Sequence, residues 1–211
     1  MLKGQRFSSL DTARSVAFDG DTDELVLGNT NDFDFGANDF TIECWVKPNS
    51  IAYTSYYKRM WSFGSADNNS MTLNVADDGT VEFRINNSSC INSGSNSLTI
   101  GGWSHMAVVR HSDKIKLYIN GIQFGSSYSY SSTLDWSQSG EDLYIGTQIG
   151  NDSSSWNGKI SNFRVVKGTA VYTTAFLPST TPLTNISNTV LLCCNNSSIT
   201  GSTVTPGTIN T

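Results

Sequence analysis

The sequence predicts an all-β fold, a two-sheet antiparallel jelly-roll sandwich. Short segments alternate apolar and polar residues, which places the apolar side chains on one face of a strand. Helical periodicity is almost absent, and Gly and Asn turns separate the segments. With 211 residues, 37% of them hydrophobic and 11% aromatic, the chain can fill the core of one large sandwich.

The first strands flank an acidic turn, and the third shows the clearest alternation. Ser15–Phe18 and Glu24–Leu27 are short β segments on either side of the turn. In Phe40–Val46, two sets of side chains alternate, so they point to opposite faces of the sheet. The first set is Phe40, Ile42, Cys44 and Val46, and the second is Thr41, Glu43 and Trp45. This segment is therefore expected to form a strand.

Hairpins account for most of the remaining strands. Met71–Val75 and Thr80–Ile85 are joined by a turn that ends in Gly, and a further strand begins near Arg59. Trp103–Arg110 and Lys114–Asn120 form a second hairpin, in which Ile115, Leu117 and Ile119 are expected to point inward. The last predicted strands are Ile122–Phe124, Asp142–Gly146, Lys159–Val166 and Thr189–Cys194.

These strands form one domain, expected over residues 15–194. Residues 1–14 are expected to be an N-terminal arm, and residues 195–211 a polar C-terminal tail. No apolar segment approaches the roughly 20 residues of a membrane span, and the N-terminus lacks the apolar stretch of a secretory signal. We therefore expect no membrane insertion, and either synthesis in a cytoplasm or a leader that this sequence does not include.

The charge balance argues against nucleic acid as a partner. The formal net charge is −5, and the 13 Lys and Arg residues are scattered singly along the chain. Binding to phosphates requires clustered basic residues. The surface must instead be rich in Ser, Thr, Asn and Gly, because only 15% of the residues are charged.

Four cysteines are expected to be reduced thiols: Cys44, Cys90, Cys193 and Cys194. A small secreted scaffold would use more cysteines at even spacing. Because Cys193 and Cys194 are adjacent, they should point to opposite faces of a strand and not share one site.

No arrangement of residues indicates catalysis. Glycoside hydrolysis usually needs two carboxyl groups about 5–10 Å apart. The four glutamates, Glu24, Glu43, Glu82 and Glu141, do not form the alternating acidic pattern of jelly-roll glucanases. His105, on a strand, is interpreted as a structural residue, and His111 as a solvated hairpin residue. We therefore expect a protein that is not an enzyme.

Aromatic residues gather in the predicted loops, where sugar rings could stack on them. They are Tyr53, Tyr56, Tyr57 and Trp61, then Tyr128, Tyr130 and Trp136, and then Trp156. Tyr and Trp are also enriched in subunit interfaces, so the residues alone leave glycan binding and an interface both open. Trp45 and Trp103, on predicted strands, are expected in or near the core.

Several segments, in order, resemble the concanavalin A-like lectin/glucanase superfamily in its laminin-G-like branch. The segments are Phe18-Asp19-Gly20, Phe40-Thr41-Ile42-Glu43-Cys44-Trp45-Val46-Lys47-Pro48, Trp103-Ser104-His105-Met106-Ala107-Val108, Leu117-Tyr118-Ile119-Asn120-Gly121 and Gly158-Lys159-Ile160-Ser161-Asn162-Phe163-Arg164-Val165. They cover about residues 15–170. The resemblance implies a lectin-like sandwich that binds a ligand.

The acidic turn at residues 19–24 is either a solvated turn or a Ca²⁺ site. Many members of the family that it resembles bind Ca²⁺ between this turn and the penultimate strand. The resemblance therefore implies a weak Ca²⁺ site made by Asp19 or Asp23, a backbone carbonyl near Gly20, and Asn162, which stands where Asp is common. Both alternatives remain open at this stage.

The segment from Val166 to Cys194 is similar to modules in virion proteins of marine bacteriophages, on tail fibres or decorating the capsid. This resemblance implies a virion-surface protein whose partners are a host-surface polysaccharide, other virion proteins, or further copies of the chain. Three hypotheses follow. The first is a lectin-like, non-catalytic virion protein, the second a purely structural decoration protein, and the third an enzyme acting on glycans with an unrecognised site.

Overall fold

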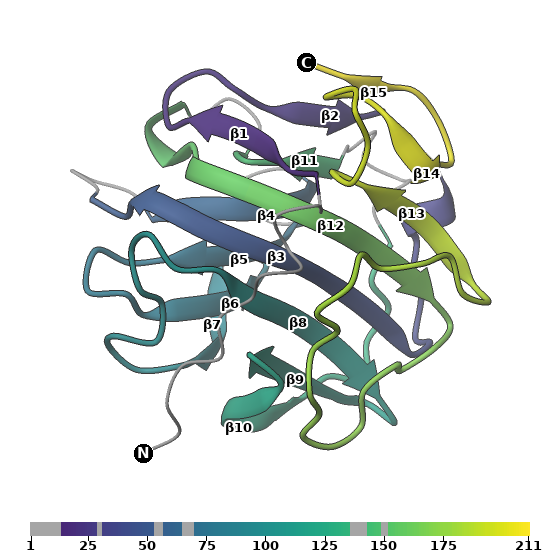
Figure 1. Ribbon diagram of the computed structural model, residues 1–211. Coiled ribbons are helices and arrows are strands. Elements are labelled where there is room, and N and C mark those ends of the chain that lie inside the picture. Colours follow the sequence, from purple (N-terminus) through teal and green to yellow (C-terminus); the bar gives the residue numbers. More distant parts are fainter. Residues whose placement is uncertain (1–13, 29–30, 53–56, 65–69, 136–142, 149–151) are drawn as a thin grey trace.

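The computed structural model describes residues 14–28, 31–52, 57–64, 70–135, 143–148 and 152–211, which form two packed antiparallel sheets (Figure 1). The described strands of sheet A are β1 (Val16–Asp19), β3 (Phe40–Ser50), β8 (Ser104–His111), β9 (Lys114–Ile119), β10 (Ile122–Ser129), β12 (Asn157–Lys167), β13 (Thr189–Cys193) and β14 (Ser202–Val204). Those of sheet B are β2 (Leu25–Leu27), β4 (Lys58–Gly64), β5 (Ser70–Val75), β6 (Val81–Ile85), β7 (Ser88–Asn92), β11 (Leu143–Ile145) and β15 (Ile209–Asn210). Two short 3-10 turns complete these elements, η2 (Asn31–Phe33) and η4 (Asp152–Ser154).

The order of the strands confirms the two-sheet sandwich. Sheet A runs β10-β9-β8-β3-β12-β13-β14, and β1 pairs with the first part of β12. Sheet B runs β15-β2-β11-β4-β5-β6-β7. Pairs of consecutive strands alternate with pairs that are distant in sequence, such as β3 with β12 and β2 with β11, as in a jelly roll.

The core lies between the sheets and follows from the predicted alternation. The inward side chains of β3 and β9, including Ile42, Leu117 and Ile119, are buried in one continuous cluster with those of sheet B. This confirms the inward positions predicted for β9. The opposite face of β3 is buried as well, because Thr41 and Glu43 are fully covered.

A strap, defined here as residues 168–188, buries this outward face of β3. It connects β12 to β13 and crosses the outward face of sheet A (Figure 1). Its backbone is attached to the sheet, since the Val171 N–H donates to Thr41 Oγ1 at 2.9 Å and the Phe176 N–H to the Gly121 carbonyl at 2.9 Å. A Cβ at residue 121 would lie 1.8 Å from the Phe176 carbonyl oxygen, so only Gly fits beneath the strap.

Residues 195–211 do not form the expected tail. β14 pairs with β13 and β15 pairs with β2, so this segment extends both sheets (Figure 1). Ile209 is buried beside Leu27. The segment was misjudged because its strands are short and polar, and backbone hydrogen bonds at a sheet edge need no apolar pattern.

Most other differences concern strand ends. β7 was not predicted, because Ile91 is its one fully buried residue. β10 continues to Ser129, beyond the predicted end at Phe124. Residues 1–13 of the expected arm lie outside the described residues. None of the helices in the described ranges is long and apolar enough to cross a membrane.

Candidate functional site

The outward face of sheet B carries a row of polar side chains set by the strand register. Met71, Leu73 and Val75 of β5 point into the core, so the alternating Thr72 and Asn74 point outward. Asn74 pairs with Glu82 of β6 on one side and with Arg59 of β4 on the other. Three strands therefore bring an amide, a carboxylate and a guanidinium together.

A second row lies beside the first. Thr72 is opposite Arg84 of β6 and opposite Ser62 of β4, and Ser62 is opposite Tyr144 of β11. The Ser62 hydroxyl donates to the Thr147 carbonyl at 3.1 Å, which brings the segment after β11 onto the same face. We call this surface the binding face: Tyr57, Arg59, Ser62, Thr72, Asn74, Glu82, Arg84, Tyr144 and Gln148.

Its two guanidinium groups differ in their environment. Arg84 pairs with Glu82 at 2.8 Å and lies 5.8 Å from the centre of the Tyr57 ring, a cation–π geometry. Burial, together with the neighbouring charge of Arg84, lowers the pKa of Arg59 to about 10. Arg59 therefore remains a cation at neutral pH.

Three side chains of the binding face have buried polar atoms without a hydrogen-bond partner in the described protein. They are Arg59 at Nε and Nη1, Asn74 at both amide atoms and Gln148 at both amide atoms. Asn74 is 0% exposed and Gln148 1% exposed. Buried polar groups are normally paired, because leaving one unpaired costs about 1–3 kcal/mol. The face thus holds donors and acceptors that the described chain does not use.

The structure separates the aromatic residues predicted for glycan binding. Tyr57 lies on the binding face. Tyr128 and Tyr130 stack on each other with ring centroids 6.2 Å apart at the β10 edge, and Arg110 lies 5.8 Å from the Tyr130 ring. Both tyrosines pack against the core cluster. They close the sandwich edge between β10 and β7, whereas Tyr53, Tyr56 and Trp136 lie outside the described residues.

Trp156 is not a surface residue, which corrects its assignment to the exposed loop aromatics. Its exposure is 0%, and its backbone N–H donates to the Gly146 carbonyl at 2.6 Å, which holds this segment against the core. Trp61 is likewise buried on the inward side of β4. Of the two core predictions, Trp45 is fully buried and Trp103 is half-buried.

The acidic turn is organised by its own hydrogen bonds. Asp19 Oδ1 accepts from the N–H of Asp21 at 2.8 Å, and Asp23 Oδ2 accepts from the N–H of Asp19 at 3.0 Å. The hydrogen bond from Asp21 is the main cause that lowers the pKa of Asp19. Gly20 has a φ of 86°, and the Asn157 amide donates to the Asp19 carbonyl at 2.8 Å.

Asn162 cannot complete a Ca²⁺ site with that turn. Asp19 pairs with Asn157, and Asn162 lies five residues further along β12, which corresponds to about 16 Å. Its Oδ1 accepts from the Leu183 N–H of the strap at 2.8 Å. The described residues contain no metal-binding group of three or more His, Cys, Asp or Glu. Ca²⁺ binding by Asp19 and Asp23 stays a prediction.

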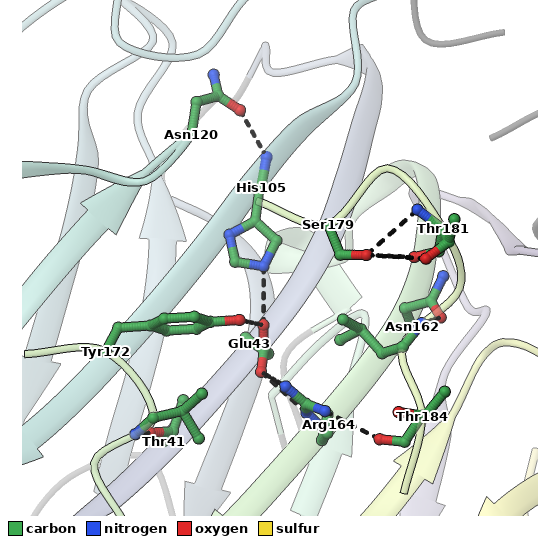
Figure 2. Close-up of polar contacts among 12 residues, drawn as sticks. Thr41, Glu43, His105, Asn120, Asn162, Arg164, Tyr172, Ser179, Thr181 and Thr184 are labelled. Carbon is green, nitrogen blue, oxygen red and sulfur yellow. Dashed lines mark hydrogen bonds and ion pairs between the residues drawn. The ribbon is translucent and has the colours of Figure 1, made fainter. Parts of the chain in front are cut away.

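The outward face of sheet A holds a buried network that the sequence did not indicate (Figure 2). Glu43 Oε2 is 3.0 Å from His105 Nε2 and accepts from the Tyr172 hydroxyl at 2.9 Å. Glu43 Oε1 accepts from Arg164 Nε at 2.9 Å, and Arg164 Nη1 donates to the Thr184 carbonyl at 2.9 Å. Both carboxylate oxygens are therefore used, and the network ties the strap to the sheet.

The electrostatics of this network follow from its burial. Burial alone would raise the pKa of Glu43, but the hydrogen bonds and charges of His105 and Arg164 outweigh it and hold that pKa below its usual value. Burial and the Glu43 charge raise the pKa of Tyr172. The structural role predicted for His105 is confirmed. Glu43, Arg164 and Tyr172 were missed because no local spacing connects three distant segments.

The adjacent cysteines also depart from the prediction. Cys193 and Cys194 are both buried, with their Sγ atoms 3.8 Å apart, and both belong to the core cluster. Cys194 has a φ of 57°, which ends the strand alternation and returns its side chain to the core. All four cysteines are free in the structure.

Solved structures with a similar fold come from several organisms. A pentraxin from Limulus polyphemus has a TM-score of 0.57 and 18% identity, covering 80% of each chain. A proposed carbohydrate-binding protein from Bacteroides ovatus has a TM-score of 0.66 and 16% identity over 88% of this chain and 52% of that one. The CBM40 domain of the Ruminococcus gnavus IT-sialidase, bound to α2,3-sialyllactose, has a TM-score of 0.56 and 12% identity over 75% of this chain and 92% of that one.

These identities are low, so the likeness concerns the fold. The chain spans about half of the Bacteroides protein. No curated protein sequence matches the chain significantly. A family model, Laminin_G_3, described as the concanavalin A-like lectin/glucanases superfamily, matches residues 19–171, which is more than half of the chain. The chain therefore belongs to the concanavalin A-like lectin/glucanases superfamily.

Proposed function

We propose that the chain is a non-catalytic glycan-binding domain that uses the binding face of sheet B. The observation that carries the proposal is the set of buried, unpartnered polar atoms on Arg59, Asn74 and Gln148. The likeness to a proposed carbohydrate-binding protein and to a domain bound to sialyllactose supports it.

The chemistry of the face suits a sugar. Each sugar hydroxyl both donates and accepts, and the Asn74 and Gln148 amides offer a donor and an acceptor each. The Tyr57 ring offers an apolar face for the C–H groups of a sugar, and the Arg84 guanidinium beside it limits how that ring is oriented.

The absence of catalysis is part of the proposal. Among the described residues of the binding face, Glu82 is the one carboxylate, and Arg84 pairs with it at 2.8 Å. Hydrolysis of a glycosidic bond by acid and base needs a second carboxyl group about 5–10 Å away. Measurable turnover of a polysaccharide would contradict this part.

The setting is the second part of the proposal: a virion surface of a bacteriophage, as capsid decoration or tail fibre, with a host-surface polysaccharide as the partner. The resemblance of residues 166–194 to virion modules supports it. Many copies on one particle would raise a weak single-site affinity through avidity. Cryo-EM of intact particles would locate the chain. A purely structural decoration protein would instead bury the binding face against its neighbours.

A glycan array with an artificially multimerised protein tests the binding. We expect hits that Tyr57→Ala weakens by roughly 5- to 30-fold, since one stacked ring contributes about 1–2 kcal/mol. Tyr128→Ala is the matched control, because Tyr128 lies at the β10 edge. Equal losses in both variants, at unchanged melting temperature, would place the site elsewhere.

A further inference from the structure

This inference rests on the proposed function and concerns the class of sugar. The binding face carries two cations, Arg59 and Arg84, and one anion, Glu82, among its described residues. The whole chain has a formal net charge of −5. The face therefore has the opposite sign to the molecule around it, which favours an anionic ligand over the rest of the surface.

The two arginines are not equivalent. Arg84 is satisfied by the chain itself, because Nη1 pairs with Glu82 at 2.8 Å and Nη2 donates to the carbonyl of Asn87. Arg59 has buried Nε and Nη1 atoms without an acceptor in the described protein. The cation left over on the face is thus Arg59.

A partly buried cation that lacks a counter-charge of its own is costly, and chains normally pair it. The charge of Glu82 acts on Arg59, but Arg84 forms the ion pair with this carboxylate, so the two arginines share it. The register neighbour of Arg59 is Asn74, whose amide is itself unpartnered. Guanidinium groups match the geometry of carboxylates and sulfates, and such charge-assisted hydrogen bonds are the strong ones.

We propose that the binding face takes an acidic glycan, and that Arg59 contacts the carboxylate or sulfate ester group of that glycan. Asn74 and Gln148 then bind neighbouring hydroxyls, and Tyr57 packs on a sugar face. The face is more exposed on the β7 side, where Arg84 is 20% exposed and Ser89 is exposed, and more buried towards Asn74.

Calorimetric titration with matched probes tests this. One pair is hexagalacturonate and its carboxyl-reduced form, and the other is a κ-carrageenan hexasaccharide and its desulfated form. We expect the acidic member of at least one pair to bind tenfold or more tightly than its neutral partner. That preference should weaken with added salt. The pair that shows it identifies the group as carboxylate or sulfate.

Variants separate charge recognition from support of the face. Arg59→Gln should weaken binding of the acidic sugar far more than binding of its neutral partner, so that the preference disappears, while Arg59→Lys should retain part of the preference. Lys159→Gln is the matched control, because this exposed lysine lies on β12 of the other sheet.

Each remaining result has a distinct meaning. Equal binding of acidic and neutral members would overturn the acidic class and leave glycan binding intact. Equal loss of both sugars in Arg59→Gln would also overturn it, because Arg59 would then only support the face. Binding of no sugar, here or on the array, would overturn the proposed function itself.

Discussion

The two sheets carry similar charged groups on their outward faces and use them differently. Sheet A has Glu43 and Arg164, and sheet B has Glu82 and Arg84. On sheet A the strap covers the pair, and His105 and Tyr172 complete its hydrogen bonds (Figure 2). On sheet B the pair stands beside Arg59, which has buried N–H groups without an acceptor in the described chain.

The difference shows that burial of a charge does not identify a site by itself. The Glu43 carboxylate is 0% exposed, but the chain supplies a partner to each of its oxygens, so the network stabilises the fold. On the binding face, buried polar atoms of Arg59, Asn74 and Gln148 have no such partners in the described chain. Unmet hydrogen bonds reduce stability, and proteins tend to keep them where function requires them.

The largest expected effect is a loss of stability when the Glu43 network of sheet A is broken. Arg164→Met leaves the Glu43 carboxylate buried without its guanidinium, so the free energy of unfolding should fall by about 3–5 kcal/mol. Chemical denaturation measures this. The comparison is Arg84→Met on sheet B, where the Arg84 side chain is 20% exposed and that of Glu82 6% exposed, so we expect a smaller loss than in Arg164→Met. Similar losses in both variants would remove the distinction between the faces.

The pH dependence of stability gives a second test of the same network. The folded pKa of Glu43 lies below its ordinary value of 4.5, so its contribution to stability is present above that value. It is lost as the pH falls through the folded pKa. We expect the wild-type melting temperature to drop below about pH 4.5, and Glu43→Gln to show a weaker drop from a lower starting point. If the melting temperatures of both proteins fell equally with pH, Glu43 would not be the source of the pH dependence.

On sheet B, removing the charge of Arg59 should raise the stability of the protein instead of lowering it. Arg59→Met replaces a guanidinium that has two buried, unpartnered nitrogen atoms by an apolar side chain of similar length, so we expect stability to rise by about 1 kcal/mol. Binding of an acidic glycan should fall in the same variant. A loss of stability comparable with that of Arg164→Met would mean that Arg59 has a structural partner.

The strand pattern predicted the sandwich well, because period-two alternation reports the buried side of a strand directly. It predicted the inward face of β9 and the hairpins. It failed for β7, β14 and β15, which are polar and lie at or near sheet edges, where backbone pairing leaves little trace in the sequence. Trp156 was misplaced because a short segment can fold inward without any periodic signal.

The sites were harder to predict than the fold. Tyr57 was identified from its position in a loop, whereas Arg59, Asn74 and Gln148 were not. Their relation depends on the register between strands, and a single sequence does not determine the register. The same limit applies to Glu43 and Arg164, which are 121 residues apart. An alternating polar face on a central strand, as in Ser70–Val75, was the one available signal.

The smallest expected effect is on the reactivity of the cysteine thiols in the core between the two faces. Burial raises the pKa of Cys44, and the hydrogen bond with Cys194 together with burial raises that of Cys193, so both remain neutral thiols and react slowly. Cys90 is half-buried beside β10. Ellman's reagent should therefore modify about one thiol in native protein and all four after denaturation.

Rapid modification of Cys193 and Cys194 in the native protein would show that the core opens near β13. The contrast between the two faces would then reflect local opening as much as hydrogen-bond pairing. A total of two in denatured, freshly prepared protein would instead reveal a disulfide, for which the 3.8 Å between the Cys193 and Cys194 sulfurs is the shortest approach among the described residues.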